Sequence, residues 1–354
     1  MQLNSRGFYV PYIKNSQNCT GCGMCLKVCN YKTTDKPIFS QPLSAYAAWN
    51  KDNHIRRISS SGGMAFALCS YLMSNGYKIC AVKYDSSTST AKHYISDTLD
   101  NLMHSLGSKY LQSDVTQAFK EIDPTKKYAI IGTPCQIDMW RRYLRLIKKE
   151  DNFILIDFFC HGIPSYNVWR KYLKEKRFFI NTSSEISFRD KKEGWHKSWN
   201  ICAYKSINDV MTGNSYYRST RESNDDFYFM FLSNVALNPA CYSDCKYKYL
   251  NSSADIRLGD LWGNKFKANK EGVSAVLTFT ERGDKLLNNI NAHLEEYPAE
   301  VVCEGQMKSC VAKPWYYRIV QKALKAPFIR ISFIKKLVIY DEIITYKISK
   351  IRGL

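Results

Sequence analysis

Four cysteines near the N-terminus have the spacing of an iron–sulfur site. Cys19, Cys22, Cys25 and Cys29 follow the pattern C-x2-C-x2-C-x3-C, the bacterial ferredoxin run that binds a 4Fe-4S cluster. Zinc sites usually divide their cysteines into two separated pairs, whereas these four form one compact run. The pattern therefore predicts that the first three thiolates bind a cluster. The fourth cysteine of such a run ligates the other cluster in two-cluster ferredoxins, so the role of Cys29 stays open.

A second candidate set consists of Cys135, Cys160, Cys241 and Cys245, each of which lies in a short motif rather than in an apolar stretch. Four thiolates from separated segments can enclose a second cluster, whereas a lone cysteine is more often a small buried hydrophobe. We favour the cluster, although the last two cysteines are spaced C-x3-C rather than C-x2-C. Five other cysteines are interpreted as buried thiols: Cys69, Cys80, Cys202, Cys303 and Cys310.

The elements around these cysteines predict an α/β fold. Near-continuous apolar runs at 127–131 and 152–158 predict buried strands, each followed by a helical pattern. Strands that alternate with helices indicate a parallel sheet, and ligands in such folds bind beyond the carboxyl ends of the strands. Cys135 and Cys160 are expected at that edge.

The rest of the chain predicts a mixed α/β (α+β) arrangement. Helices are expected at about 64–75, 137–148, 165–177, 225–234 and 282–294. Strands are expected at 77–84, 254–262 and 273–280, with an antiparallel pair at 186–190 and 199–204. Residues 31–50 are interpreted as a polar connection. We expect a small 4Fe-4S module at 1–35, a main domain at 50–300 with an antiparallel insertion, and a basic tail at 314–354.

The chain is long and strongly basic. Its 354 residues predict two or three domains, and its formal net charge of +19 favours anionic partners such as an acidic electron carrier or an anionic membrane surface. No nucleic-acid recognition motif accompanies the charge, so we expect no nucleic-acid partner. Thirteen cysteines without a secretion signal indicate a reducing, cytoplasmic location.

The tail at 314–354 holds nine Lys or Arg residues against two acids. Ile329, Phe333 and Leu337 recur at four-residue steps, which is typical of an amphipathic helix. Two interpretations stay open. The tail contacts the inner membrane face peripherally, or it packs on the core and leaves a basic face in solvent.

Five motifs follow one another along the chain: SSSGG at 59–63, GTPCQ at 132–136, DFFCHGIP at 157–164, SFRDK at 187–191 with GW at 194–195, and DIRLGDLWG at 255–263. Their series resembles the coenzyme F420 hydrogenase/dehydrogenase beta-subunit family over about 55–280, and the ferredoxin-type module is typical of that family. The resemblance implies an FAD-containing iron–sulfur oxidoreductase. It would pass electrons from a reduced carrier, such as a ferredoxin or flavodoxin, through 4Fe-4S clusters to FAD and on to a substrate. Surface-polysaccharide biosynthesis is one candidate setting, and use of F420 itself is not implied.

The resemblance also assigns residues to FAD. The turn at 59–63 precedes a helix and would hold a phosphate at the positive helix terminus; the alternative is a simple helix cap. His161 is a candidate proton donor, because imidazole titrates near neutrality, or else a structural histidine. The residues assigned to FAD binding are Ser59, Ser60, Ser61, Gly62, Gly63, Thr133, Gln136 and Asp260.

The segment RGFYVP at 6–11 resembles the midpoint of a two-run ferredoxin domain. The module would then be the second half of such a domain, with the first half lost or the start codon misplaced, which leaves the fourth ligand of its cluster open. The alternative function is a non-catalytic electron-relay or adaptor subunit that carries clusters without a working flavin site.

Overall fold

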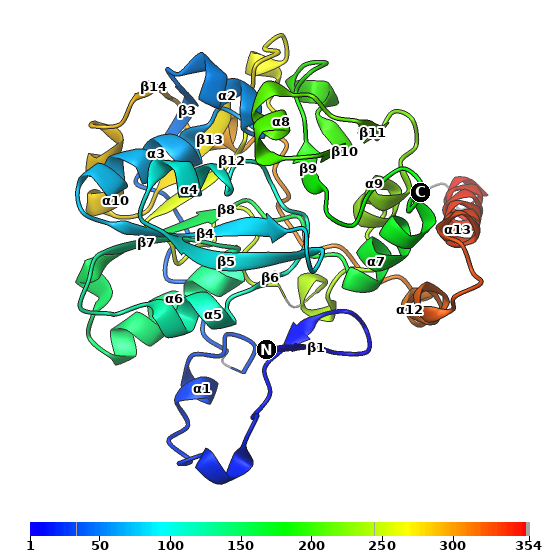
Figure 1. The fold of residues 1–354 in the computed structure, drawn as a ribbon, viewed down its shortest axis with the longest axis horizontal. Coiled ribbons are helices and arrows are strands. Elements are labelled where there is room, and N and C mark those ends of the chain that lie inside the picture. Colours follow the sequence, from blue (N-terminus) through cyan, green and yellow to red (C-terminus); the bar gives the residue numbers. More distant parts are fainter. Residues whose placement is uncertain (33, 244, 352–354) are drawn as a thin grey trace.

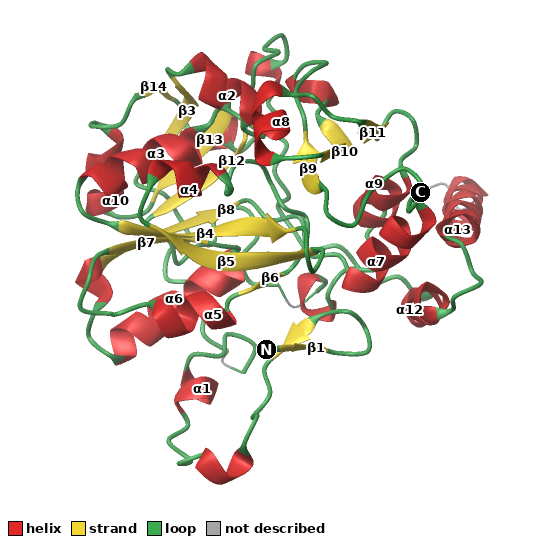
Figure 2. Cartoon of the chain, in the orientation of Figure 1, coloured by secondary structure: helices red, strands yellow, loops and turns green. Residues whose placement is uncertain are grey.

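A nine-stranded mixed sheet runs through the computed structural model, which describes residues 1–32, 34–243 and 245–351 (Figures 1 and 2). The strand order is β14-β3-β13-β12-β8-β7-β4-β5-β6. The central strands β12, β8, β7 and β4 are parallel to one another, which confirms the expected parallel sheet. The strands are β3 (Ser44–Asn50), β4 (Lys78–Asp85), β5 (Thr90–Ser96), β6 (Ser113–Asp114), β7 (Tyr128–Ile131), β8 (Phe153–Phe158), β12 (Ile256–Asp260), β13 (Ser274–Thr278) and β14 (Ala292–Glu296).

Helices cover both faces of this sheet (Figure 1). Side chains of a strand point alternately to opposite faces. In β8, Ile154 and Ile156 therefore pack in the cluster that contains α3, whereas Phe153 and Leu155 pack in the cluster that contains α6. The helices are α1 (Met24–Lys27), α2 (Asn53–Ile58), α3 (Met64–Ser74), α4 (Leu99–Met103), α5 (Thr116–Glu121), α6 (Pro134–Leu146), α7 (Tyr166–Glu175), α8 (Ile207–Thr212), α9 (Asp226–Leu232), α10 (Glu281–Leu287), α11 (Ala299–Val302), α12 (Tyr317–Lys325) and α13 (Ile331–Ile351).

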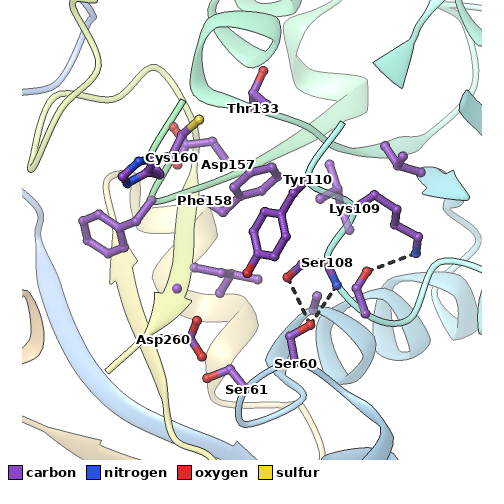
Figure 3. Close-up of a pocket in the computed structure, with 18 of the residues that line it drawn as sticks. Ser60, Ser61, Ser108, Lys109, Tyr110, Thr133, Asp157, Phe158, Cys160 and Asp260 are labelled. Carbon is purple, nitrogen blue, oxygen red and sulfur yellow. Dashed lines mark hydrogen bonds between the residues drawn. The ribbon is translucent and has the colours of Figure 1, made fainter. Parts of the chain in front are cut away.

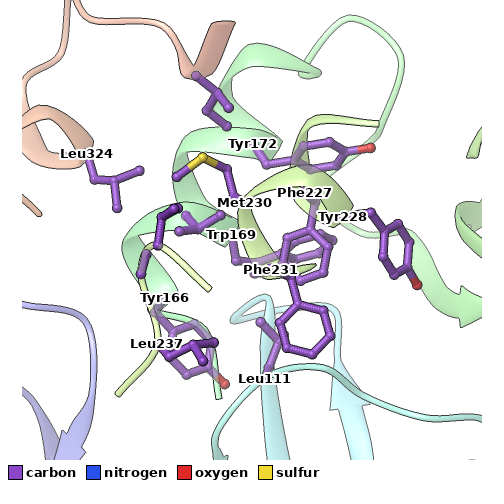
Figure 4. Packing of buried hydrophobic residues seen from close by; sticks show 14 of the residues in the cluster. Leu111, Tyr166, Trp169, Tyr172, Phe227, Tyr228, Met230, Phe231, Leu237 and Leu324 are labelled. Atoms are coloured by element: carbon purple, nitrogen blue, oxygen red, sulfur yellow. The ribbon is translucent and has the colours of Figure 1, made fainter. Parts of the chain in front are cut away.

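The predicted antiparallel insertion is confirmed as a three-stranded sheet of β9 (Glu185–Arg189), β10 (Trp199–Tyr204) and β11 (Tyr217–Thr220). An aromatic-rich cluster joins this sheet to the C-terminal helices (Figure 4). Trp169 of α7 stacks on Tyr172 and meets Phe227 of α9 edge to face. The cluster extends to Leu324 of α12 and Ile334 of α13. The C-terminal helices therefore belong to the core of this half of the molecule.

The N-terminal segment projects from the sheet (Figure 1). Its strands β1 (Gln2–Leu3) and β2 (Tyr9–Val10) form a small hairpin. Between them, the carbonyl of Gly7 accepts a hydrogen bond from the Tyr166 backbone N–H at 2.9 Å, and Phe8 is buried. The hairpin thus ties the module to the start of α7. Short 3-10 turns complete the chain: η1 (Ser16–Asn18), η2 (Glu150–Asn152), η3 (Trp195–Lys197), η4 (Pro239–Cys241) and η5 (Asn264–Phe266).

Three local expectations were wrong. Residues 44–50 are not a connection but strand β3, whose small Ala45, Ala47 and Ala48 are buried between neighbouring strands. The helix expected at 282–294 ends at Leu287, and the next segment pairs with β3 as the edge strand β14. Helix α6 begins at Pro134 rather than near 137, because proline fits the first helical position, where no N–H is needed.

The tail folds as α12 and α13, with residues 352–354 of the expected tail outside the described part. In α13 the residues that face the core are Ile331, Ile334 and Val338, whereas Phe333 and Leu337 of the expected apolar face are exposed. The helix has two apolar faces, and only one can pack against α9. Within the described residues, no helix is both long enough and apolar enough to cross a membrane.

Candidate cofactor sites

A cavity of about 480 Å³ lies at the carboxyl ends of the central parallel strands. Its walls come from the loops after β7 and β8, the end of β12, the first turn of α3 and the loop at 105–111 (Figure 3). This is the edge at which open α/β sheets bind ligands, and the volume is typical of a small-molecule site. Of the residues assigned to FAD, all except Gly62 line this cavity: Ser59, Ser60, Ser61, Gly63, Thr133, Gln136 and Asp260.

The serine turn before α3 uses its hydroxyls to hold itself in place. Ser59 Oγ donates to the Ile55 carbonyl and Ser61 Oγ donates to the Val273 carbonyl, at 2.7 and 2.8 Å. Ser60 Oγ accepts a hydrogen bond from the Ser108 backbone N–H at 2.7 Å (Figure 3). The first turn of α3, beginning at Met64, faces the cavity, and its N–H groups have no partner within the helix. Any phosphate would therefore meet backbone N–H groups more than serine hydroxyls.

Thr133 and Gln136 close the N-terminus of α6. The Thr133 backbone N–H and hydroxyl both donate to Gln136 Oε1, at 3.1 and 3.0 Å. Gln136 Nε2 in turn donates to Ser113 Oγ at 3.0 Å. Both side chains line the cavity. Their polar atoms bond to each other and to Ser113, so these hydrogen bonds fix the position of the cavity wall.

Aromatic rings form one wall of the cavity. Tyr110 and Trp199 are nearly parallel, with ring centroids 5.6 Å apart and an interplanar angle of 7°. The buried Arg189 lies over the Trp199 ring and donates to the Tyr110 hydroxyl and to Asp260, at 3.2 and 3.1 Å. Trp195 Nε1 also donates to the Asp260 carboxylate at 2.8 Å. Asp260 thus anchors Arg189 behind a flat aromatic surface.

The loop at 105–111 was not singled out from the sequence, because no motif marks it. Lys109 Nζ donates to the backbone carbonyls of Ser105, Leu106 and Gly107, at 2.7, 2.8 and 3.0 Å. Burial lowers the pKa of Lys109 to about 7. The side chain folds back on its own loop (Figure 3) and fixes the neighbouring Ser108 and Tyr110 at the cavity wall.

His161 also lines the cavity. Its Nε2 lies 2.7 Å from Asn234 Oδ1, and its ring meets Phe231 edge to face. Burial lowers the pKa of His161 below its ordinary value, so the neutral imidazole, with a proton on Nε2, fits this contact. His161 therefore has a structural hydrogen bond as well as access to the cavity.

A second, smaller cavity gathers the second cysteine set. Cys135, Cys160, Cys241 and Cys245 all line it, although they come from three separate segments. Burial raises the pKa of the Cys160 thiol to about 12, and the nearby Lys248 ammonium opposes that shift. Lys248 Nζ donates to the carbonyls of Cys160 and His161, both at 2.8 Å. Within the described residues, no group of three or more His, Cys, Asp or Glu side chains is arranged to hold a single metal ion.

The two cavities share one wall. Cys160, Gly162, Ile163, Tyr247 and Lys248 line both of them. The loop after β8 therefore has the large cavity on one side and the cysteine set on the other.

The N-terminal cysteines lie at the surface. Cys19, Cys22 and Cys25 are exposed and Cys29 is partly exposed. The Met24 backbone N–H, next to the Cys22 sulfur, lowers the pKa of that thiol. The run thus includes the short helix α1, which contains Cys25.

A direct contact links this run to the second set. Asn30, which follows Cys29, is buried, and its Nδ2 donates to the Cys135 carbonyl at 2.7 Å. Lys246 Nζ donates to the Asn30 carbonyl at 3.1 Å. The adjacent Tyr31 also lines the smaller cavity, together with Cys135.

The interpretation of five cysteines as buried thiols holds for Cys69, Cys80, Cys202 and Cys303. It is wrong for Cys310, which is only partly buried and whose Sγ donates to the Cys245 carbonyl at 3.2 Å. A cysteine 65 residues away in sequence has no local pattern that would reveal this proximity.

Comparison with known proteins decides the family. Residues 45–120 match the N-terminal model of the coenzyme F420 hydrogenase/dehydrogenase beta subunit, and residues 125–300 match its C-terminal model. The chain belongs to this family. It is thereby related to oxidoreductases, and the resemblance inferred from the five motifs is confirmed.

Among solved structures, the chain matches one in the F420-reducing NiFe hydrogenase complex from Methanosarcina barkeri. The two chains are 16% identical, with a TM-score of 0.48, over 83% of this chain and 91% of that chain. No curated protein sequence matches the chain. All five motif segments lie within the family-matched residues. Most of the residues that line the two cavities lie there as well, except Gly305, Gln306 and Met307 of the larger cavity and Asn30 and Tyr31 of the smaller one.

Proposed function

We propose that this beta-subunit family member is an iron–sulfur flavoprotein oxidoreductase. Electrons from a reduced carrier would pass through 4Fe-4S clusters to FAD and on to a substrate. The observation that carries the proposal is the wall shared by the large cavity and the cysteine cavity. Cofactors bound in the two cavities would be separated by only one loop, an arrangement that would favour direct electron transfer between them.

The large cavity fits a flavin. Tyr110, Trp199 and Trp262 present flat apolar surface to a planar ring, and the first turn of α3 presents N–H groups and a positive dipole to a diphosphate. FAD, when bound, supplies the exchange between single electrons and electron pairs. Arg189 and Asp260 hold the aromatic wall in place, while Lys109 keeps the 105–111 loop closed against the cavity.

The smaller cavity fits a cluster in the number and type of its ligands. Four thiols face one space from separate segments, and a cubane of four irons separates its thiolates more widely than a single ion does. Burial raises the pKa values of the Cys135, Cys160 and Cys241 thiols, so these thiols would lose their protons only on binding metal. Lys248 supplies a positive charge beside the thiolates and fixes the Cys160 backbone.

The N-terminal run is the proposed entry point for electrons. Its cysteines are exposed to a carrier, and Asn30 bridges from the residue after Cys29 to Cys135. The net charge of +19 favours an acidic ferredoxin or flavodoxin as the donor. His161 is the proposed proton donor, because its ring lines the large cavity.

The test is anaerobic purification of the full chain, followed by iron and flavin analysis. Iron together with stoichiometric FAD supports the enzyme, whereas iron without flavin supports the alternative of an electron-relay or adaptor subunit. Cys135→Ala and Cys160→Ala should each abolish the same low-temperature resonance signal of the reduced protein. Full iron content in both variants would show that these are core thiols and that the chain carries one cluster at most.

A further inference from the structure

Large apolar side chains are exposed at one corner of the molecule, around α12 and α13. Phe328 is 81% exposed, Trp315 is 73% exposed and Tyr340 is 68% exposed. Phe333 and Leu337 of α13 are exposed as well. Single exposed apolar residues are ordinary on protein surfaces, but a concentration of them marks an interaction site. These five residues are here called the C-terminal patch.

The patch is a second apolar face of a helix whose first face is already used. Ile331, Ile334 and Val338 point into the core. Phe333, Leu337 and Tyr340 follow the spacing i, i+4, i+7, which places them on one side of the helix, and they remain exposed. Packing against α9 therefore does not account for these three apolar side chains of α13.

The end of α7 extends this surface. Glu175, the last residue of α7, accepts a hydrogen bond from the Ile331 backbone N–H at 2.9 Å. Phe178 and Phe179, which follow shortly after α7, are both exposed. Figure 1 shows α7, α12 and α13 at the same edge of the molecule. The end of α7 therefore lies next to the start of α13.

The surroundings of the patch are basic. Residues 305–340 contain eight Lys or Arg residues and no Asp or Glu. Lys322, Lys325, Arg330 and Lys336 are exposed, whereas Lys335 is buried and bound to Asp226 at 2.8 Å. Two acids, Asp341 and Glu342, follow this stretch directly, and Asp341 accepts a hydrogen bond from Trp315 Nε1 at 2.9 Å. The cations beside the aromatic residues still outnumber these acids.

We propose that the C-terminal patch docks the protein onto an anionic lipid surface. A helix with aromatic and aliphatic residues on one face and cations beside them inserts its apolar face at the boundary between headgroups and acyl chains. Aromatic rings are also favoured at that boundary, and the cations pair with anionic headgroups. A second copy of the chain is a poorer occupant, because two such basic surfaces would repel each other.

The test is co-sedimentation of the full chain with vesicles. The vesicles are either phosphatidylcholine alone or an equimolar mixture of phosphatidylcholine and phosphatidylglycerol. Wild type should bind the anionic vesicles at least tenfold more tightly, since each basic residue near such a surface contributes about fivefold in affinity. The double variant Phe328→Ser with Phe333→Ser should lose about tenfold or more, because two exposed aromatic anchors are removed.

Matched controls separate this surface from the rest of the molecule. Lys325→Glu with Arg330→Glu should weaken binding to anionic vesicles by more than about tenfold. Lys51→Glu with Lys267→Glu makes the same change in net charge at exposed positions elsewhere and should bind nearly as wild type does. Because every substituted side chain is exposed, circular dichroism should show unchanged folding in all variants.

Several outcomes would overturn the proposal. One is equal binding by the two charge-reversal double variants, which would mean that only the total charge of the protein matters. Another is absence of binding to both kinds of vesicle. A third is a wild-type dimer in sedimentation velocity that the Phe328→Ser and Phe333→Ser double variant abolishes, because the patch would then be occupied by a second copy.

Discussion

Breaking one buried ion pair should cost this protein several kcal/mol of stability. Asp157 of β8 and Arg257 of β12 lie opposite each other in the parallel register, and both side chains are 0% exposed. The pair is bidentate: Arg257 Nε donates to Asp157 Oδ1 at 2.7 Å, and Nη2 donates to Oδ2 at 2.6 Å. The pair joins β8, which is followed closely by Cys160, to β12, which ends at Asp260.

The expected size follows from burial. Exposed ion pairs contribute about 0–1 kcal/mol, whereas removing one partner of a buried pair costs about 3–5 kcal/mol, because the other charge is left uncompensated. In Asp157→Asn, Arg257 would keep its hydrogen bonds to the carbonyls of Tyr249 and Asn251, at 2.6 and 2.9 Å. These remaining acceptors place the expected loss at the lower end, about 3 kcal/mol.

Equilibrium urea unfolding, followed by circular dichroism under anaerobic conditions, measures this loss. Glu281→Gln is the matched control, because it removes one charge from the exposed pair of Lys285 and Glu281 at 3.6 Å; its cost should stay within about 0.5 kcal/mol. The double variant Asp157→Leu with Arg257→Met should recover most of the stability, since apolar replacement of a buried pair is often neutral. A loss in Asp157→Asn no larger than in the control would refute the argument.

Three further predictions concern the cofactor sites and pH. Cys22→Ser should lower bound iron and cluster absorbance while FAD is retained, because the N-terminal run projects from the sheet and does not line the large cavity; unchanged iron would contradict the assignment. Asn30→Ala removes the 2.7 Å hydrogen bond to the Cys135 carbonyl and should slow flavin reduction by reduced ferredoxin several-fold at unchanged iron and flavin content; an unchanged rate would place the electron route elsewhere. Burial lowers the pKa of His93 to about 4. Between about pH 6.5 and pH 4, His93 is therefore protonated in the unfolded chain but not in the folded protein, so the free energy of unfolding decreases as the pH is lowered. Wild type should therefore lose about 2 kcal/mol more than His93→Gln between pH 7 and pH 5, and equal losses in the two proteins would show that His93 is not the cause.

The sequence by itself determined the central α/β unit. The apolar runs at 127–131 and 152–158 became β7 and β8, and the helices after them begin and end within a few residues of the expected positions. These features are local, because a buried parallel strand needs a short continuous apolar run and a helix start needs its capping residues. The five motifs likewise identified the family, since each consists of adjacent residues.

Tertiary structure alone decided which distant residues meet. No local pattern marked Cys310 beside Cys245, Lys248 between the two cavities or Asn30 against Cys135. Edge strand β14 and buried strand β3 were missed for a similar reason, because their pairing partners are determined by the tertiary structure. In addition, neither the alanines of β3 nor the two glutamates that end β14 favour a strand. In α13 the sequence offered two apolar faces, and only packing against α9 determined that Ile334 would be buried and Phe333 left exposed.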